Sequence, residues 1–237
     1  MEQIVLGDIR IDVLKKDIKN IHLSVYPPSG KVRISAPLRM DTDTIRIFAI
    51  SKLGWIKKQQ TKLREQERET PREYINRESH YYLGKRYLLR IATGSSSPKV
   101  TLKHDIIELQ MRKGSFAEKS RVILESWYRQ KLKAIAPKYI RKWEPKMDVE
   151  VKELGVKKMK TKWGTCSREA GRIWLNLELI KKPLHCIEYI IVHEMLHLLE
   201  RKHNENFILH MDKFLPKWRF CKEELNKSPL RHENWSY

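Results

Sequence analysis

The sequence predicts an α+β fold in two parts, and three observations carry this prediction. Apolar and polar residues alternate in two separate stretches of the N-terminal half, as they do in half-buried β-strands. Apolar residues recur at helical spacing elsewhere, and one such helix contains two histidines four positions apart. We expect an N-terminal α+β region over residues 1–112, with two β regions around a long helix. A second domain over residues 113–237 should pack a small antiparallel or mixed sheet on the histidine-bearing helix.

The N-terminal region is expected to begin with β-strands and continue into a helix. Alternation covers residues 4–36 and is interrupted by Pro27 to Gly30, whose residues favour a turn. Apolar residues then recur at helical spacing from Ile45 to Leu63, and Asp41 to Asp43 can cap the start of this helix. The pattern stops at Thr70-Pro71, because proline cannot continue a helix.

The next elements are a polar helix end, a second β region and a long helix. Residues 57–72 are almost wholly polar, so we expect this part of the helix to project from the body. Strands should form within residues 79–112, around a loop at Gly94 to Pro98. Helical spacing from Phe116 to Trp143 predicts a long helix that bends at Pro137.

The remaining elements surround the histidine-bearing helix, which is expected over residues 184–200. Strands are expected at residues 149–154 and 172–180, and two short helices at 205–215 and 218–226 close the chain. If the second strand is a sheet edge above the histidines, an extended peptide can pair with it as an additional strand. The alternative is a half-buried strand with no binding role.

The segment His193-Glu194-Met195-Leu196-His197 is the most informative in the chain. On a helix, His193 and His197 lie one turn apart, so both imidazoles can bind one metal ion. Glu194 is rotated by about 100° from His193, which places its carboxylate beside the ion as a general base for water. Buried imidazoles and carboxylates are costly unless they are paired or bind a metal, which favours a metal site over a plain amphipathic helix.

A third protein ligand would complete a catalytic rather than a structural zinc site, because a fourth position then stays open for water. His203 is the first candidate for this ligand. The other candidates are Glu200, His210, Glu223 and Glu224. The expected ion is Zn²⁺, and the expected chemistry is hydrolysis, in which Glu194 takes a proton from the attacking water and delivers it to the leaving amine.

The chain is strongly basic, with 49 Lys and Arg against 29 Asp and Glu, a net charge of +20 and a pI near 9.9. The residues from Arg129 to Trp163 are the most basic, with twelve Lys or Arg against four acids. Nucleic acid or an acidic protein is the partner that such a charge favours, and the alternative is a solvated basic surface. No helix-turn-helix, RRM or zinc-finger spacing supports a dedicated nucleic-acid module.

A cytoplasmic location is expected from the cysteines and from the N-terminus. Cys166, Cys186 and Cys221 are an odd number and far apart, which is typical of reduced thiols. Charged residues interrupt the N-terminal apolar residues, so no signal peptide is expected. No apolar run approaches the ~18 residues of a membrane span.

Three segments form a distinctive set: Lys160 to Ser167 (KTKWGTCS), the strand from Ile173 to Ile180, and residues 190–207 (IIVHEMLHLLERKHNENF). Together they resemble the YgjP-like metallopeptidase family. The resemblance extends through the N-terminal half, in Pro28-Ser29-Gly30, Ala36-Pro37, Trp55-Ile56 and Tyr82 to Tyr87. It therefore spans nearly the whole chain.

The resemblance implies a zincin-like catalytic domain with His193, His197 and His203 as zinc ligands and Glu194 as base. SprT-like proteases, which act on DNA-bound proteins, belong to the wider zincin group, and relatives are described near restriction-modification genes. Glu200 departs from the related metzincin pattern, which has a turn-forming glycine at this position. The helix must therefore end by another route, around residues 201–204.

The sequence thus favours a zinc metallopeptidase that acts on a peptide or protein substrate. The rival hypothesis is a nucleic-acid-associated basic module, linked to DNA restriction or repair, with a vestigial or structural metal site. The role of Trp163 to Cys166 is open: Gly164 suggests a tight turn, and Cys166 is expected to pack rather than act as a nucleophile, because no base partner is evident.

Overall fold

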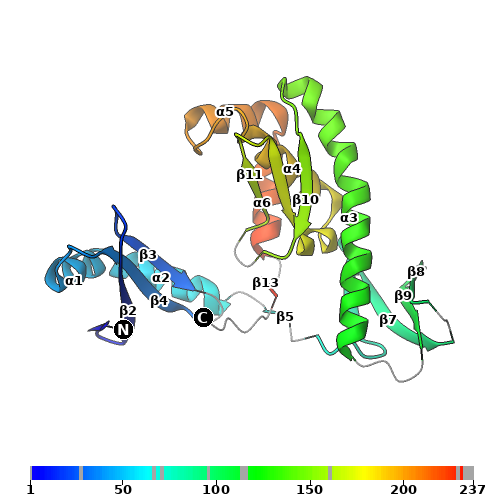
Figure 1. Ribbon diagram of the computed structural model, residues 1–237, viewed down its shortest axis with the longest axis horizontal. Helices are drawn as coiled ribbons and strands as arrows, with labels where there is room; N and C mark the ends of the chain where they lie inside the picture. Colours follow the sequence, from blue (N-terminus) through cyan, green and yellow to red (C-terminus); the bar gives the residue numbers. More distant parts are fainter. Residues whose placement is uncertain are drawn as a thin grey trace. The chain divides into compact units, whose positions relative to one another are not determined.

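The computed structural model describes residues 2–26, 29–65, 68–69, 72–94, 97–112, 117–159, 162–227 and 230–231. The chain forms two compact units, Met1–Pro71 with Lys227–Tyr237, and Arg72–Asn226. Both units contain helices and strands, so the α+β prediction is confirmed (Figure 1). The boundary expected after residue 112 lies inside the second unit, because the second β region packs with the long helix that follows it.

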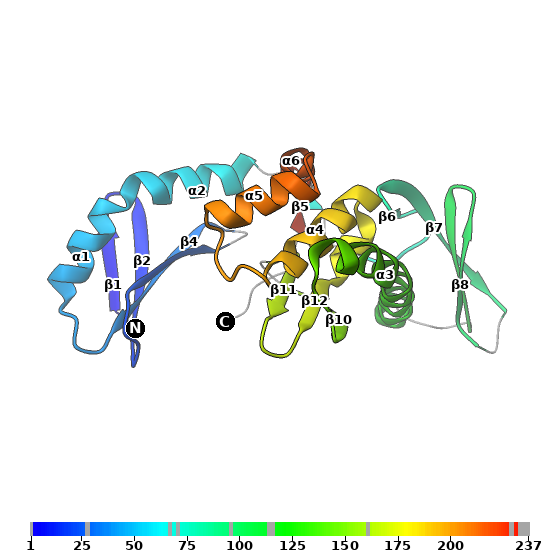
Figure 2. The ribbon, with the colours of Figure 1, turned by 90° about the horizontal axis from the view of Figure 1, so that it is seen from above.

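The first unit is a four-stranded sheet covered on one face by two helices (Figure 2). Its strand order is β1-β2-β4-β3, with β2 and β4 parallel and the other two pairs antiparallel. The elements are β1 (Glu2–Leu6), β2 (Ile9–Lys16), β3 (His22–Tyr26), β4 (Lys31–Pro37), α1 (Thr42–Ser51) and α2 (Leu53–Glu65). The short strands β5 (Arg68–Glu69) and β13 (Leu230–Arg231) pair in parallel.

The strands expected at residues 4–36 are confirmed, but the single helix expected after them is two helices. Asp41 caps α1 as predicted, since its side chain accepts a hydrogen bond from the backbone N–H of Thr44. Lys52 leaves the helical conformation and ends α1. The polar end of α2 was expected to project from the body, but it is attached to the sheet at Gln60. The side-chain amide of Gln60 donates a hydrogen bond to the carbonyl of Gly30 at 2.9 Å. Pro27 and Pro28 of the predicted turn lie outside the described residues.

The second unit begins with another four-stranded sheet, of order β6-β7-β9-β8. Its strands, β6 (Ser79–Tyr82), β7 (Lys85–Thr93), β8 (Lys99–Lys103) and β9 (Ile106–Met111), confirm the second predicted β region. The long helix α3 (Ala117–Met147) runs from this sheet to the opposite end of the unit (Figure 1). It continues through Pro137, and its buried side chains include Leu124, Trp127 and Leu132.

A three-stranded mixed sheet precedes the histidine-bearing helix, as predicted, but its strands differ from those expected. They are β10 (Glu153–Lys157), β11 (Gly164–Ser167) and β12 (Arg172–Asn176), in the order β10-β12-β11. The strand expected to reach residue 180 ends at Asn176, whose side chain accepts from the N–H of Glu178 and starts a 3₁₀ helix, η1 (Leu177–Lys181). Because β12 is the central strand of this sheet, the hypothesis that it is a sheet edge above the histidines is wrong, and the alternative of a strand without this binding role applies.

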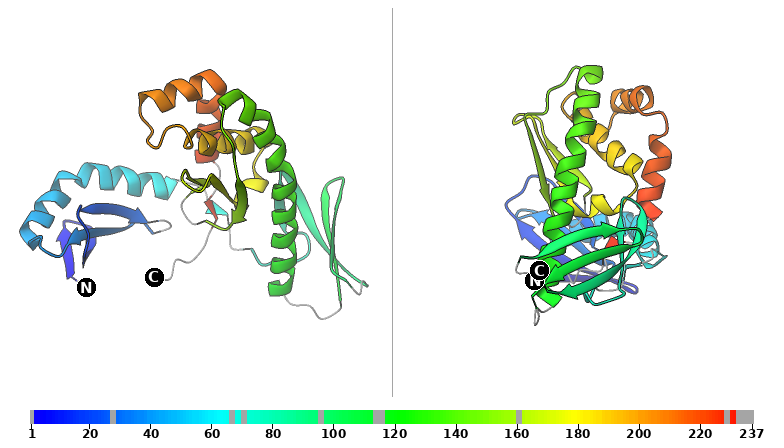
Figure 3. Two further views of the ribbon diagram at one scale, coloured as in Figure 1. Left: turned by 45° about the horizontal axis from the view of Figure 1, so that its top comes forward. Right: turned by 90° about the vertical axis from the view of Figure 1, so that its right-hand side faces the viewer.

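The helix α4 (Leu184–Leu196) lies between this small sheet on one side and α5 (Glu205–Phe214) and α6 (Trp218–Lys227) on the other (Figure 3, right). The two C-terminal helices confirm the predicted ones. The helix α4 is exposed at its first residues and largely buried from Cys186 onward. Its apolar buried residues include Ile187, Ile190, Ile191, Val192, Met195 and Leu196. Within the described residues no helix is both long and apolar enough to cross a membrane. All three cysteines are free.

The two units have separate apolar cores, so a cavity in one should weaken that unit selectively. Ile34 is fully buried in the first core. We expect Ile34→Ala to cost about 2–5 kcal/mol, and to speed amide hydrogen exchange in β2 and β4 while leaving α4 protected. Leu132→Ala in the second core should give the reverse pattern. Equal loss of protection in both units after either substitution would contradict this independence.

Candidate metal centre

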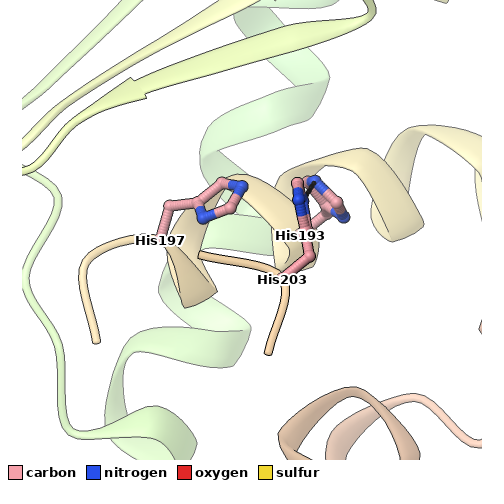
Figure 4. A group of neighbouring side chains, drawn as sticks. All are labelled: His193, His197 and His203. Atoms are coloured by element: carbon pink, nitrogen blue, oxygen red, sulfur yellow. Dashed lines mark hydrogen bonds between the residues drawn. The ribbon is translucent and has the colours of Figure 1, made fainter. Parts of the chain in front are cut away.

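Three imidazoles converge at the C-terminal end of α4 (Figure 4). His193 and His197 extend from the end of the helix, and His203 reaches them from the segment before α5. The Nε2 atoms of His193 and His203 lie 3.0 Å apart, and one ligand nitrogen from each of the three rings lies within 4.8 Å of the others. The structure therefore brings together the three histidines that the sequence singled out.

The return of the chain from His197 to His203 does not need a glycine. The last turn of α4 tightens, because the N–H groups of residues 197–199 each donate to a carbonyl three residues earlier. The carbonyl of Glu200 then accepts a hydrogen bond from Nδ1 of His197 at 3.0 Å. This bond fixes the orientation of the His197 ring and leaves its Nε2 available to a metal.

Phe207 supports all three rings from the first turn of α5. Its ring centroid lies 5.0 Å from those of His193 and His197 and 4.7 Å from that of His203. The side chain of Asn204 caps α5 by accepting from the N–H of Phe207 at 2.9 Å. This contribution of Asn204 and Phe207 was not predicted from the sequence, although asparagine at a helix start is a recognisable cap signal.

Burial and neighbouring charges favour the neutral form of two of the imidazoles, those of His193 and His203. Burial, followed by the neighbouring His197, His203 and Lys222, lowers the pKa of His193 to about 3. Burial and the charges of His197 and Lys222 also lower the pKa of His203. Neutral imidazole is the form that binds a transition metal. Three convergent imidazole nitrogens therefore fit a divalent ion such as zinc.

Glu194 faces the neighbouring strand β11 and is only 5% exposed. Burial raises the pKa of its carboxyl to about 8, and the charge of Lys162 opposes this rise. Gly164 gives the carboxylate its room, since a Cβ there would lie 2.7 Å from both Cγ and Oε1 of Glu194. Gly164 begins β11, so its role is this close approach and not the tight turn expected from the sequence.

The histidines and Glu194 line a cleft of about 920 Å³ between α4 and β11. The β11 strand and its flanks supply Lys162 to Glu169, α4 supplies Tyr189, Ile190, His193 and Glu194, and the rest comes from His197, Arg201, His203, Lys222 and Leu225. Since β11 is an edge of its sheet, the backbone along this wall has no further strand on its outer side among the described residues. The sheet edge beside the histidines is therefore β11, a strand that was not predicted from the sequence.

The alternative third ligands are engaged elsewhere or lie outside the cluster. Oε2 of Glu200 accepts from Asn204 at 3.2 Å, and the His210 ring stacks on Phe214. Glu224 lies 2.5 Å from His185 and accepts from the thiol of Cys186, which makes a separate group of potential ligands. Among the described residues, none of the four alternatives, Glu223 included, belongs to the histidine group.

Met211 and Cys166 both have packing roles, and for Cys166 this role was expected from the sequence. Met211 is fully buried in α5. Burial and the nearby Glu194 raise the pKa of the Cys166 thiol to about 11, so this cleft residue is not a thiolate at neutral pH. A cysteine nucleophile is therefore disfavoured.

Comparison with known proteins gives one extensive match. A family model described as YgjP-like, metallopeptidase domain, matches residues 19–228. No curated protein matches the chain. The metallopeptidase zymogen abylysin of Pyrococcus abyssi is 16% identical, with a TM-score of 0.36, over 38% of this chain and 90% of that chain. The zymogen jannalysin of Methanocaldococcus jannaschii is 17% identical, with a TM-score of 0.33, over 40% of this chain and 92% of that chain.

The contact between Gly164 and Glu194 can be tested by substitution. A methyl group at residue 164 must displace the Glu194 side chain, so we expect Gly164→Ala to lower the free energy of unfolding by about 1–3 kcal/mol. Gly54→Ala is a matched control, because its Cβ meets nothing within 4 Å in α2 and alanine favours a helix. Chemical denaturation measures both changes, and an equal response of the two variants would contradict the close approach.

The raised pKa of Glu194 predicts a pH dependence in metal-free protein. Between its ordinary value of 4.5 and about 8, the unfolded chain releases a proton that the folded chain retains. The contribution of Glu194 to the free energy of unfolding should therefore fall as pH rises through this range and level off above it. Below pH 6.5, the ordinary pKa of histidine, the lowered pKa values of His193 and His203 act in the opposite direction, so the net decline is expected between pH 6.5 and about 8. Glu194→Gln should flatten the decline, as measured by denaturation after chelation. An unchanged slope in Glu194→Gln would show that another group causes the pH dependence.

Proposed function

The chain belongs to the YgjP-like metallopeptidase family, and on this premise we propose that it is a zinc-dependent peptidase with a three-histidine site. The proposed ligands are His193, His197 and His203, and the proposed general base is Glu194. The observation that carries the assignment is the convergence of three imidazoles beside a buried carboxylate. Members of this family are metal-dependent hydrolases. What we propose for this chain is the identity of the ion and of the residues that bind it.

Zinc is the ion that this donor set fits best. Imidazole nitrogens suit zinc better than magnesium or calcium, which take oxygen ligands. Three protein ligands with an open side towards the cleft are typical of catalytic zinc. When bound, zinc lowers the pKa of water and polarises a carbonyl group. The hydrogen bond from His197 to the carbonyl of Glu200 and the packing of Phe207 hold the rings in place for this role.

Glu194 would handle the proton in peptide hydrolysis. It receives the proton released as water attacks the scissile carbonyl and then delivers it to the leaving nitrogen. The carboxyl has a pKa of about 8 in the buried, metal-free cleft. A positive charge beside it favours the carboxylate, so this group becomes a base at neutral pH when a cation is held by the histidines. Gly164 keeps it close to the cleft wall.

The edge strand β11 would bind the substrate backbone. An extended peptide that pairs with an exposed strand gains a ladder of main-chain hydrogen bonds, which fixes its direction along the cleft. Gly164 to Ser167 form this edge opposite α4. A peptide held there would pass the three histidines and Glu194. The substrate is thus proposed to bind in an extended conformation.

Metal content and turnover together test the proposed function. The wild type should contain about one zinc per chain and hydrolyse a protein substrate such as casein. Glu194→Gln should retain the zinc but lose at least 10²-fold in turnover, because only the proton transfer is removed. His203→Ala should lose zinc as well as activity. Mass spectrometry of untagged protein and a casein cleavage assay supply the two measurements.

His210→Ala is the matched control, since this histidine stacks on Phe214 outside the cluster. It should retain both zinc and activity. Undiminished hydrolysis by a zinc-replete Glu194→Gln preparation would refute the proposed base. Absence of bound metal from the wild type after reconstitution would refute the metal site itself.

A further inference from the structure

Four cationic side chains surround the cleft that contains the histidines. They are Lys162, Arg168, Arg201 and Lys222. They approach from different parts of the unit: Lys162 precedes β11, Arg168 follows it, Arg201 lies between two of the histidines, and Lys222 is on α6. All four are exposed. The positive charge therefore comes from several elements that meet at the cleft, and not from one basic segment.

These four cations differ from many others in the unit because they have no acidic partner among the described residues. By contrast, Lys142 pairs with Glu188 at 2.6 Å, and Arg172 pairs with Glu153 at 2.6 Å. The acidic residues that line the cleft are Glu169 and the buried Glu194. Four positive charges therefore face at most one exposed negative charge, and the cleft is left with an excess of positive charge.

Two of the charges are close enough to influence the reacting groups. Lys222 lowers the pKa of both His193 and His203, and Lys162 opposes the raised pKa of Glu194. A ligand charge near either lysine would therefore lie near the point of bond cleavage. Positive charge concentrated in a cleft raises the local concentration of anionic ligands and favours their binding.

We propose that this cleft selects peptide segments rich in aspartate or glutamate around the scissile bond. Cleavage of a peptide bond in this cleft rests on the proposed function. The predicted preference for binding acidic peptides does not require turnover. A peptide is favoured over nucleic acid because the cleft wall is the free edge of β11, which offers hydrogen bonds to an extended peptide backbone. Carboxylates of that peptide would pair with the four cations on both sides of the edge.

Binding of two matched peptides tests the proposal. One fluorescein-labelled ten-residue peptide carries four glutamates, and the other carries four glutamines at the same positions. Anisotropy titrations use the full chain with Glu194→Gln, which prevents cleavage, and wild-type hydrolysis is measured in parallel. We expect about tenfold tighter binding of the glutamate peptide, from several exposed charge pairs, and a preference that weakens as salt is raised.

Matched charge-reversal variants assign the preference to the cleft. Arg168→Glu with Lys222→Glu should abolish or invert it. Lys133→Glu with Lys138→Glu, two exposed positions on α3 outside the cleft, changes the net charge equally and should leave it intact. Zinc content and circular dichroism of each double variant confirm that the site is preserved. Equal loss of preference in both would assign it to net charge and overturn the proposal.

The remaining outcomes separate this inference from the proposed function. If neither peptide is cleaved but the cleft-dependent preference is present, the peptidase function fails and the inference stands. If both peptides are cleaved but bind equally, the inference is overturned and the peptidase function stands. If a single-stranded oligonucleotide with the same charge displaces the glutamate peptide and binds more tightly, the cleft prefers nucleic acid and the inference is overturned.

Discussion

The burial of α4 is the constraint on which the second unit depends. This helix is apolar on nearly every side, and it packs against α3, the three-stranded sheet and α5. Three polar groups at its C-terminal end, His193, Glu194 and the capping His197, are accommodated where this end of the helix meets a cleft. The surrounding elements thus serve two needs at once: they cover the apolar surface of α4, and they leave its polar end open to a ligand.

The position of the cluster is determined at the junction between α4 and α5. The helix ends without a left-handed glycine, and its last backbone N–H groups are satisfied by a tightened turn. The segment that follows has to place His203 beside His193 and Phe207 against all three rings within a few residues. Asn204 makes this possible by starting α5 at once. Imidazole orientation therefore depends on cap chemistry as much as on the helix that carries two of the rings.

The sequence predicted the parts that depend on local periodicity and left open those that depend on contacts far apart in the chain. The spacing of His193 and His197 is local, so their convergence followed from the helical repeat. The choice of His203 over Glu224 required knowledge of where α6 lies, because Glu224 pairs with His185.

Asn176 at the end of β12 donates hydrogen bonds to the carbonyl groups of Met159 and Lys162, and the alternation of apolar residues does not reveal these bonds. The four-residue strand β11 has too little alternation to be recognised. The strands β6 to β9 resemble the first sheet in pattern but pack on α3, and the sequence pattern does not reveal this packing.

The net charge of +20 has different meanings in different parts of the molecule. In the basic stretch from Arg129 to Trp163, several cations are neutralised by acids or lie over aromatic rings: Lys142 pairs with Glu188, and Lys146 lies over Trp143. Around the cleft, the cations lack acidic partners among the described residues. Desolvation and local geometry, more than the density of lysine in the sequence, decide where a charge can act on a ligand. The densest basic segment contributes only Lys162 to the cleft, and the other three cations, Arg168, Arg201 and Lys222, come from later parts of the chain. The density of charge along the sequence is therefore a weaker guide to the binding surface than the set of cations that line the cleft.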